Sequence, residues 1–303
     1  MRILVTGGNG QVGWELTRTL SALGEVVSCD RERADLSMPQ TLKALVAGVA
    51  PDVLVNAAAY TAVDKAEEDT TSAALVNAQA VGVLAEAARN AGALFVHYST
   101  DYVFDGAKSG PYVESDPVTP LSAYGRTKLD GERAVAAAGG DWLVFRTSWV
   151  YGPRGRNFLR TMLRLAAQRE QLSVVSDQIG APTSARAIAQ WTAHAVRQSL
   201  AERASGTFAS GLFHLTASGS TSWHGFATQI VDAARRALGD DAILARRVEP
   251  IPASRYPTPA RRPANSLLDN TAFERRFGLW RQPWDAAMQD VLDDVFERMG
   301  ELR

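Results

Sequence analysis

A tyrosine and a lysine four positions apart, Tyr124 and Lys128, are the residues of this sequence best suited to proton chemistry. On a helix, that spacing puts both side chains on one face, about one turn apart. An ammonium beside the phenol would stabilise the phenolate and lower a tyrosine pKa that is ordinarily about 10. Such a tyrosine exchanges a proton with a substrate oxygen near neutral pH. Ser99 and Thr100, further upstream, add two hydroxyl groups.

In the first half of the chain, short apolar runs alternate with helical segments, and these elements must position the residues named above. Because buried parallel strands are short apolar runs joined by helical crossovers, the pattern predicts an α/β fold with a Rossmann-type doubly wound parallel sheet. The tyrosine and the lysine fall on the last helix of this series. The predicted strands cover 3–5, 25–29, 52–56, 94–98 and 142–146, and the predicted helices cover 11–23, 41–49, 71–91 and 123–138.

The pattern becomes less regular after about residue 148. We expect a dinucleotide-binding domain over 1–148 and a smaller, partly interleaved α/β domain over 149–303, which mainly binds substrate and returns some segments to the first domain. A proline- and arginine-rich stretch, 250–263, suits an extended segment lying over another surface. Within the second half we expect helices at 158–168 and 185–200 and strands at 173–175 and 213–215.

A glycine loop directly follows the first predicted strand and opens the first helix. Gly7, Gly10 and Gly13 fit the spacing G-x-x-G-x-x-G, which allows a tight turn and a close approach of the backbone to a pyrophosphate at the helix N-terminus. Asp30, seventeen positions after Gly13, ends the second strand where an acid can bind the ribose hydroxyls of NADH. Arg31 and Arg33 can instead pair with the 2′-phosphate of NADPH, so the sequence is compatible with either NADH or NADPH as the cofactor.

The loops at the carboxyl ends of the other strands complete the predicted cofactor site. A doubly wound sheet binds its ligand at this edge, and the small side chains of 57–59 let a cofactor lie against the backbone. The cofactor contacts that we expect are Gly7, Gly10, Gln11, Val12, Gly13, Asp30, Arg31, Asp35, Leu36, Ala57, Ala58, Ala59, Tyr60, Tyr124 and Lys128.

Charge balance and cysteine content exclude some classes of binding partner and indicate the cellular compartment. With 32 Lys and Arg against 33 Asp and Glu, no global field recruits nucleic acid or an anionic membrane. The single cysteine, Cys29, cannot form an internal disulfide and fits a reducing compartment. The apolar start of the chain is too short for a signal peptide, and no stretch is long enough to span a bilayer. We therefore expect a cytoplasmic protein.

These features together resemble the extended branch of the short-chain dehydrogenase/reductase superfamily. Longer motifs narrow the resemblance to the dTDP-4-dehydrorhamnose reductases, nearly from end to end; they lie at 55–64, 98–104, 146–151, 176–183 and 256–266. The resemblance implies hydride transfer from NADPH or NADH to the C4 ketone of dTDP-6-deoxy-L-lyxo-4-hexulose, which gives dTDP-L-rhamnose for cell-surface polysaccharide. It also implies roles for the hydroxyl and amine groups. Tyr124 would protonate the developing alkoxide, Lys128 would depress the tyrosine pKa and hold the nicotinamide ribose, and Thr100 would hydrogen-bond the carbonyl oxygen.

The same resemblance implies the ligands of the nucleotide sugar. Trp149 would border the sugar, and the two downstream motifs would hold the nucleotide diphosphate. The expected substrate contacts are Ser99, Thr100, Trp149, Gln178, Pro182, Thr183, Arg262, Asn265 and Ser266.

One position departs from the family pattern. Some members join two subunits through a metal held by acidic side chains; Glu15 matches one such ligand, but Arg186 stands where a second acid is expected. A cation there would repel Mg²⁺, and Asp293 and Asp294 cannot readily replace the missing acid. We therefore expect no metal and a monomer or a homodimer, in which Arg186 could pair with an acid across the interface.

Two other functions stay open as alternatives. A nucleotide-sugar dehydratase requires an Asp-Glu pair directly after Thr100, but here Tyr102 follows Asp101. A cysteine-dependent epimerase requires a thiol in the cleft, but Cys29 lies on the second predicted strand, away from it. A non-catalytic regulatory subunit of the same fold could lose the tyrosine or the lysine, and this chain keeps both.

Overall fold

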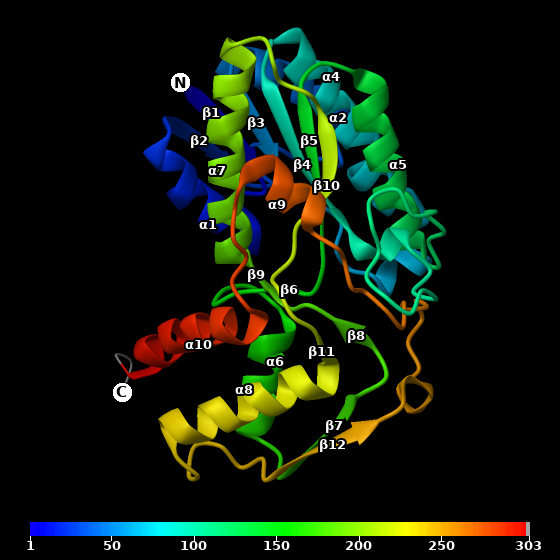
Figure 1. Ribbon diagram of the computed structural model, residues 1–303, viewed down its shortest axis with the longest axis vertical. Coiled ribbons are helices and arrows are strands. Elements are labelled where there is room, and N and C mark those ends of the chain that lie inside the picture. The colour runs from blue at the N-terminus through cyan, green and yellow to red at the C-terminus, as the bar shows by residue number, and fades with distance from the viewer. Residues whose placement is uncertain (301–303) are drawn as a thin grey trace.

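The computed structural model describes residues 1–300 and is built around a parallel sheet of six strands (Figure 1). Their order is β10-β5-β4-β3-β1-β2, and every ladder between them is parallel. The predicted doubly wound α/β fold is confirmed. The strands are β1 (Arg2–Thr6), β2 (Glu25–Cys29), β3 (Val53–Asn56), β4 (Leu94–Thr100), β5 (Trp142–Thr147) and β10 (Gly211–His214).

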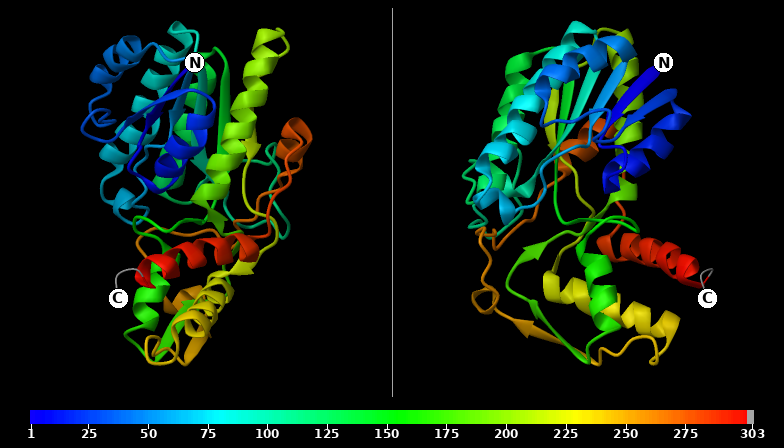
Figure 2. Two further views of the ribbon diagram at one scale, coloured as in Figure 1. Left: turned by 90° about the vertical axis from the view of Figure 1, so that its left-hand side faces the viewer. Right: turned by 180° about the vertical axis from the view of Figure 1, so that it is seen from behind.

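Helices cover both faces of this sheet (Figure 2). Because side chains alternate along a strand, Ile3 and Val5 enter one apolar core and Leu4 enters the other. The first core includes residues of α1 (Gln11–Thr19) and α7 (Ala185–Ala204); the second includes residues of α2 (Pro39–Val49), α4 (Ala80–Asn90) and α5 (Ala123–Ala138). Burial on both faces explains why the strands are continuous apolar runs.

Several short elements lie between the main ones. The helix expected over 71–91 is divided into α3 (Thr70–Ala74), a π-helical turn η3 (Leu75–Gln79) and α4. The 3₁₀ turns are η1 (Leu20–Ala22), η2 (Lys65–Glu67), η4 (Asp101–Val103) and η5 (Ala253–Arg255).

The second part of the chain lies beyond the carboxyl ends of the strands, in the lower half of Figure 1. The boundary expected after residue 148 falls between β5 and β6, while α7, β10 and α9 (Thr271–Phe277) lie at the sheet. The lower part contains β6 (Val150–Tyr151), α6 (Phe158–Ala166), β7 (Gln171–Val175), β8 (Ile179–Gly180), β9 (Thr183–Ser184), β11 (Thr221–Ser222), α8 (Trp223–Leu238), β12 (Arg247–Ile251) and α10 (Trp284–Gly300). The sequence pattern predicts none of α8, α9 and α10.

Residues 256–268, which we call the C-terminal strap, join the two parts. This segment climbs from β12 toward the sheet (orange in Figure 1). The Ile179 N–H donates to the Ala264 carbonyl, the Ser266 N–H donates to the Ile179 carbonyl, and the Tyr112 N–H donates to the Leu267 carbonyl. Backbone hydrogen bonds therefore tie the strap to β8 and to the loop before α5. Within residues 1–300, no helix has the length and apolar character needed to cross a bilayer.

Candidate active site

Helix α5 places the predicted tyrosine and lysine, and its glycines determine how closely it packs. The Ser122 hydroxyl caps the helix by accepting a hydrogen bond from the Gly125 N–H at 3.1 Å. A Cβ on Gly125 would lie 2.2 Å from the Tyr102 carbonyl oxygen, and one on Gly131 would lie 2.2 Å from the Asn77 carbonyl oxygen. Only glycine allows this contact, and it brings α5 against the end of β4.

Tyr124 lies beside Thr100 at this contact. Its ring packs edge-on against Tyr102, with the ring centres 5.5 Å apart. Burial raises the pKa of Tyr124 to about 12, a hydrogen bond with the Thr100 hydroxyl lowers it, and the charge of Asp101 raises it. The expected lowering of this pKa by Lys128 is wrong for this arrangement, because the lysine amine is engaged elsewhere.

Lys128 is buried and its amine is held by β4. Nζ donates to the Tyr98 carbonyl oxygen at 2.6 Å and lies 3.2 Å from Nε2 of His97. Burial lowers the pKa of Lys128 to about 8, against the opposing charge of Glu132. The amine is therefore poised between its charged and neutral forms close to neutral pH.

A buried polar network extends from this lysine to the glycine-loop side of the sheet. His97 Nδ1 lies 3.1 Å from Asn56 Nδ2, and Asn56 Oδ1 accepts from the Thr6 hydroxyl at 2.6 Å. The register of the sheet aligns these residues, because Asn56 is paired with both Thr6 and His97. Sequence reasoning missed His97; the available signal was one polar residue inside an otherwise apolar strand.

Ser99, expected to contact substrate, points from β4 toward helix α5, as His97 does two positions before it. Its hydroxyl donates to Glu132 at 2.5 Å, and Glu132 forms a bidentate pair with Arg146 at 2.7 and 2.8 Å. All three residues are buried. Ser99 thus braces a core ion pair on the side of β4 that faces α5, because residues two apart on a strand share a face.

The glycine loop has the shape that a dinucleotide requires. Gly7 has φ of +73°, and a Cβ there would lie 2.7 Å from the Ala58 backbone nitrogen. A Cβ on Gly13 would lie 2.0 Å from the Gly7 carbonyl oxygen, so the helix packs closely on the loop. No side chain caps the start of α1, which leaves its first N–H groups to an anion. The chain therefore fits the pyrophosphate of NAD(P)H.

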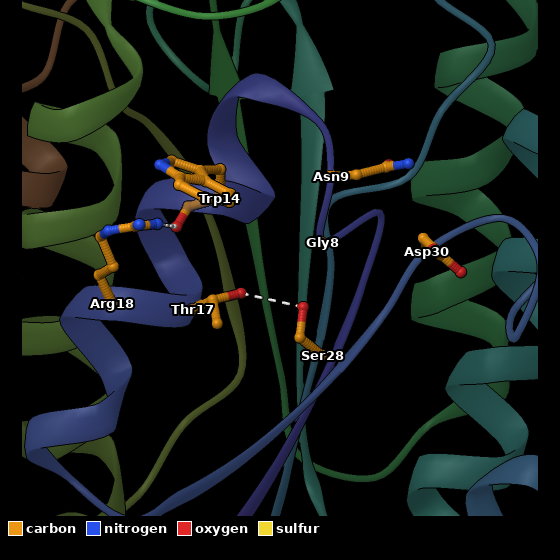
Figure 3. A pocket seen from close by; sticks show the side chains of 7 residues that line it. All are labelled: Gly8, Asn9, Trp14, Thr17, Arg18, Ser28 and Asp30. Atoms are coloured by element: carbon orange, nitrogen blue, oxygen red, sulfur yellow. Dashed lines mark hydrogen bonds between the residues drawn. The ribbon is translucent and has the colours of Figure 1, made fainter.

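A pocket opens beside this loop, between α1 and β2 (Figure 3). Its lining residues are Gly8, Asn9, Trp14, Thr17, Arg18, Ser28 and Asp30. Oδ1 of Asp30 accepts from the backbone N–H groups of Glu32 and Arg33, and the Arg18 guanidinium stacks on Trp14 at 3.6 Å. The pocket is thus lined by both a carboxylate and a guanidinium.

The other expected cofactor contacts occupy varied positions around the loop. Arg31 is exposed and pairs with Asp35 at 3.6 Å, and Leu36 is buried in the core. Gln11 Oε1 accepts from Asn157 at 2.7 Å, which ties the glycine loop to the start of α6. Val12 and Ala57 pack against one core, Ala58 packs against the other, and Ala59 is partly buried beside them.

Asn77 anchors the loop that contains Tyr60. Its side chain bonds the backbone N–H and carbonyl of Tyr60 at 2.8 and 3.1 Å, and donates to Thr127 on α5 at 3.1 Å. Tyr60 and Tyr124 pack against the same small cluster of alanines. The π-helical turn η3 therefore holds the 57–61 loop beside α5.

The comparisons with known proteins agree with this geometry. The profile of the family described as "RmlD substrate binding domain" matches residues 1–297. The chain belongs to this family. A dTDP-4-dehydrorhamnose reductase of Burkholderia thailandensis is 58% identical over 296 residues, covering 96% of this chain and 99% of that protein. The reductase of Escherichia coli K12 is 44% identical and covers 98% of each chain.

Solved structures of the same kind of enzyme have the same fold. A dTDP-4-dehydrorhamnose reductase from Clostridium acetobutylicum has a TM-score of 0.85 at 38% identity, covering 97% of this chain and 99% of that one. The reductase from Bacillus anthracis in complex with NADP has a TM-score of 0.86 at 30% identity, with the same coverage.

Within this RmlD-family chain, most of the expected substrate ligands also make contacts of their own. Trp149, with φ of +50°, stacks on Trp223 at 3.6 Å. The Thr183 hydroxyl donates to the Ala181 carbonyl and accepts from the Ala217 N–H. Pro182 is buried and Gln178 is partly buried. These side chains are fixed within the lower part of the molecule.

The strap residues are engaged in the same way. Asn265 donates to the carbonyls of Lys108 and Gly110 at 2.8 and 2.9 Å. Ser266 is buried and its side chain lies close to Asp101. Arg262 pairs with Asp64 at 2.9 Å, and both side chains keep about a third of their surface exposed (31% and 39%). Arg262 is therefore the strap ligand with the greatest freedom to change partner.

The position that departs from the family's metal pattern is paired inside the chain. Arg186 forms an ion pair with Asp294 of the same chain. Glu15 is buried. In residues 1–300, no group of three or more His, Cys, Asp and Glu side chains is arranged to hold a metal ion.

Proposed function

We propose that this chain reduces the C4 ketone of dTDP-6-deoxy-L-lyxo-4-hexulose (dTDP-4-dehydro-L-rhamnose) to dTDP-L-rhamnose, the last step of dTDP-rhamnose biosynthesis. The observation that carries the proposal is the meeting of Thr100 and Tyr124 at the carboxyl edge of the sheet, next to a glycine loop shaped for a dinucleotide. Relatives named for this reaction cover nearly the whole chain.

Thr100 and Tyr124 have different roles in the proposed reaction. When bound, NADPH or NADH supplies the hydride. Thr100 offers its hydroxyl to the carbonyl oxygen, and Tyr124 gives that oxygen a proton as negative charge develops on it. With its pKa raised to about 12, Tyr124 is protonated at neutral pH, which is the form that a reduction needs. The chain's own groups thus keep the proton on the phenol until a stronger base appears.

In this proposal the nucleotide diphosphate is bound by Arg262, Gln178 and Thr183. A diphosphate is a stronger partner for a guanidinium than one carboxylate, because it offers more oxygens and more charge. Arg262 would exchange its ion pair with Asp64 for the substrate. The proposal places the enzyme in the cytoplasm, with a monomer or a homodimer as its working state.

A coupled assay tests this function. The purified protein is mixed with dTDP-4-dehydro-6-deoxy-D-glucose and its 3,5-epimerase, and the absorbance of NADPH or NADH is followed, with the product identified by mass spectrometry. We expect oxidation of the cofactor that requires the epimerase and yields dTDP-L-rhamnose. Absence of oxidation with either cofactor would exclude the reductase function.

A further inference from the structure

The arginines near the pocket beside the glycine loop differ in what they can offer a ligand. The sequence predicts Arg31 and Arg33 as partners of a 2′-phosphate. The Arg31 side chain, however, is 80% exposed and pairs with Asp35. Among residues 1–300, the arginine that lines the pocket is Arg18 of α1, together with Asp30. The guanidinium best placed for an anion in this pocket is therefore not one that the sequence predicts.

The charge of Arg18 is not neutralised by a carboxylate. Its guanidinium stacks on the Trp14 ring, 3.6 Å from the ring centre, and its Nη1 donates to the Trp14 carbonyl oxygen at 3.4 Å. None of the ion pairs within residues 1–300 includes Arg18. Because a guanidinium has five N–H donors, Arg18 keeps several of them for a ligand.

A second guanidinium lies on the same indole. Arg154, from the loop between β6 and α6, stacks on the Trp14 ring at 3.6 Å. Asn157 fixes this loop, because its Nδ2 donates to the Gly152 carbonyl at 2.8 Å and to Gln11 Oε1 at 2.7 Å. Two positive charges beside one ring raise the local electrostatic potential. This side of the pocket therefore favours an anionic group.

The other side of the pocket holds an acid. Asp30 lies across from Arg18 and Trp14 (Figure 3). Its Oδ1 accepts from the N–H groups of Glu32 and Arg33, so this oxygen is engaged in the turn after β2. In dinucleotide-binding folds, the acid at the end of this strand lies beside the adenosine ribose. The ribose, with or without a phosphate, would then lie between a carboxylate and a guanidinium that has no acid partner.

We propose that Arg18, held on the ring of Trp14, binds the 2′-phosphate of NADPH and is the residue by which this chain distinguishes NADPH from NADH. A guanidinium binds a phosphate through planar, charge-assisted hydrogen bonds, and NADH lacks this phosphate. Asp30 acts in the opposite direction, because its carboxylate repels a phosphate and accepts hydrogen bonds from free ribose hydroxyls. A cation on α1 and an acid on β2 thus determine the cofactor preference together.

Binding of the oxidised cofactors tests the proposal without the sugar, so its outcome does not depend on the proposed function. Isothermal titration calorimetry of the full-length protein gives the dissociation constants of NADP⁺ and NAD⁺, and their ratio is the readout. In Arg18→Ala we expect NADP⁺ to bind about 10- to 100-fold more weakly, as for one hydrogen bond to a charged group. NAD⁺ binding should change little. An unchanged ratio in Arg18→Ala would overturn the proposal.

Asp30→Asn is the variant with the opposite expected sign. Its amide oxygen can still accept from the N–H groups of Glu32 and Arg33, so the turn is kept while the charge is lost. We expect the ratio to shift further toward NADP⁺. A shift toward NAD⁺ in both Asp30→Asn and Arg18→Ala would show that the substitutions act on the shape of the pocket and not on its charge, and it would overturn the proposal.

Arg133→Ala is the matched control for the loss of one positive charge. Arg133 is an exposed residue of α5 that pairs with Asp130, so the ratio of the two dissociation constants should stay the same. A loss of NADP⁺ preference in Arg31→Ala or Arg33→Ala that Arg18→Ala does not show would assign the 2′-phosphate to the turn after β2. That result would also overturn the proposal.

Discussion

The end of β4 and the C-terminal strap both present polar side chains to the site, but they hold those side chains in different ways. Beside β4, the side chains of Asn56, His97 and Lys128 are all buried and bond one another and the groups around them, which are the Thr6 hydroxyl, the Ala58 N–H and the Tyr98 carbonyl. Along the strap, Asn265 donates to backbone carbonyls of a distant loop, and Arg262 forms a partly exposed ion pair. The first region is a closed network and the second is a set of bridges between loops.

This difference assigns different tasks to the two regions. A buried network is costly to disturb, because any group left without a partner pays its full desolvation penalty. It therefore holds catalytic groups in one geometry. A partly exposed ion pair contributes little to stability, so it can exchange partners with a ligand at low cost. We expect changes at the end of β4 to alter turnover or folding, and changes in the strap to alter substrate affinity.

The largest effect expected from this comparison is on turnover in Tyr124→Phe. Loss of the proton donor should lower kcat by about 10²- to 10⁴-fold, the usual contribution of a positioned acid. Binding of NADPH, followed by fluorescence titration, should change little. Tyr102→Phe is the control, since its ring packs edge-on against Tyr124 and should keep most of the turnover. Full activity of Tyr124→Phe would remove the proton-donor role.

The next largest effect concerns the pH dependence of stability at Asp101. Burial raises the pKa of this carboxyl to about 6, so folding disfavours its charged form. Below pH 4 both the folded and the unfolded state bind the proton; between pH 4 and pH 6 the unfolded state loses it first, and stability falls as pH rises. Above pH 6 the full penalty applies, about 3 kcal/mol for a shift of this size.

Asp101→Asn removes this titration and provides the measurement. Its free energy of unfolding in urea, relative to the unchanged protein, should rise between pH 4 and pH 8 by up to that amount. Asp116→Asn is the control with the opposite sign. Hydrogen bonds from Lys108 and from the Val113 N–H hold the pKa of Asp116 below its ordinary value, so this variant should lose relative stability as pH rises. A flat difference for Asp101→Asn would contradict the burial argument.

A smaller effect on folding is expected where α5 meets the turn after β4. In Gly125→Ala the new Cβ would lie 2.2 Å from the Tyr102 carbonyl, so α5 must move; overpacking of this kind costs about 1–3 kcal/mol. Turnover should fall with it, because Tyr124 moves too. Gly48→Ala is a matched control on helix α2 with no atom within 4 Å of the new Cβ, and it should stabilise the protein by about 0.4–1 kcal/mol. Equal stability of the two variants would contradict the close approach.

The same two regions show which features could be predicted from the sequence alone and which could not. The strand ends, the glycine loop and the helix of Tyr124 and Lys128 could be predicted because period and spacing determine which face a side chain takes. The partner of Lys128 could not, because His97 meets it only through the register of β4 against α5. The contacts of Asn265 and Ser266 were equally hidden, since they join segments more than 150 residues apart.

The smallest effect, and the one that separates the regions most clearly, concerns Arg262. If the strap exchanges its ion pair for the nucleotide diphosphate, Arg262→Ala should raise KM for the sugar nucleotide about tenfold, close to the value of one charge-assisted hydrogen bond. Asp64→Asn breaks the same ion pair but keeps the guanidinium, so its KM should stay unchanged or fall. Both variants should lose less than about 1 kcal/mol of stability in urea, since the pair is partly exposed. Equal rises of KM in the two variants would mean that the ion pair acts by holding the strap in place, and the strap would then share the positioning task of the buried network.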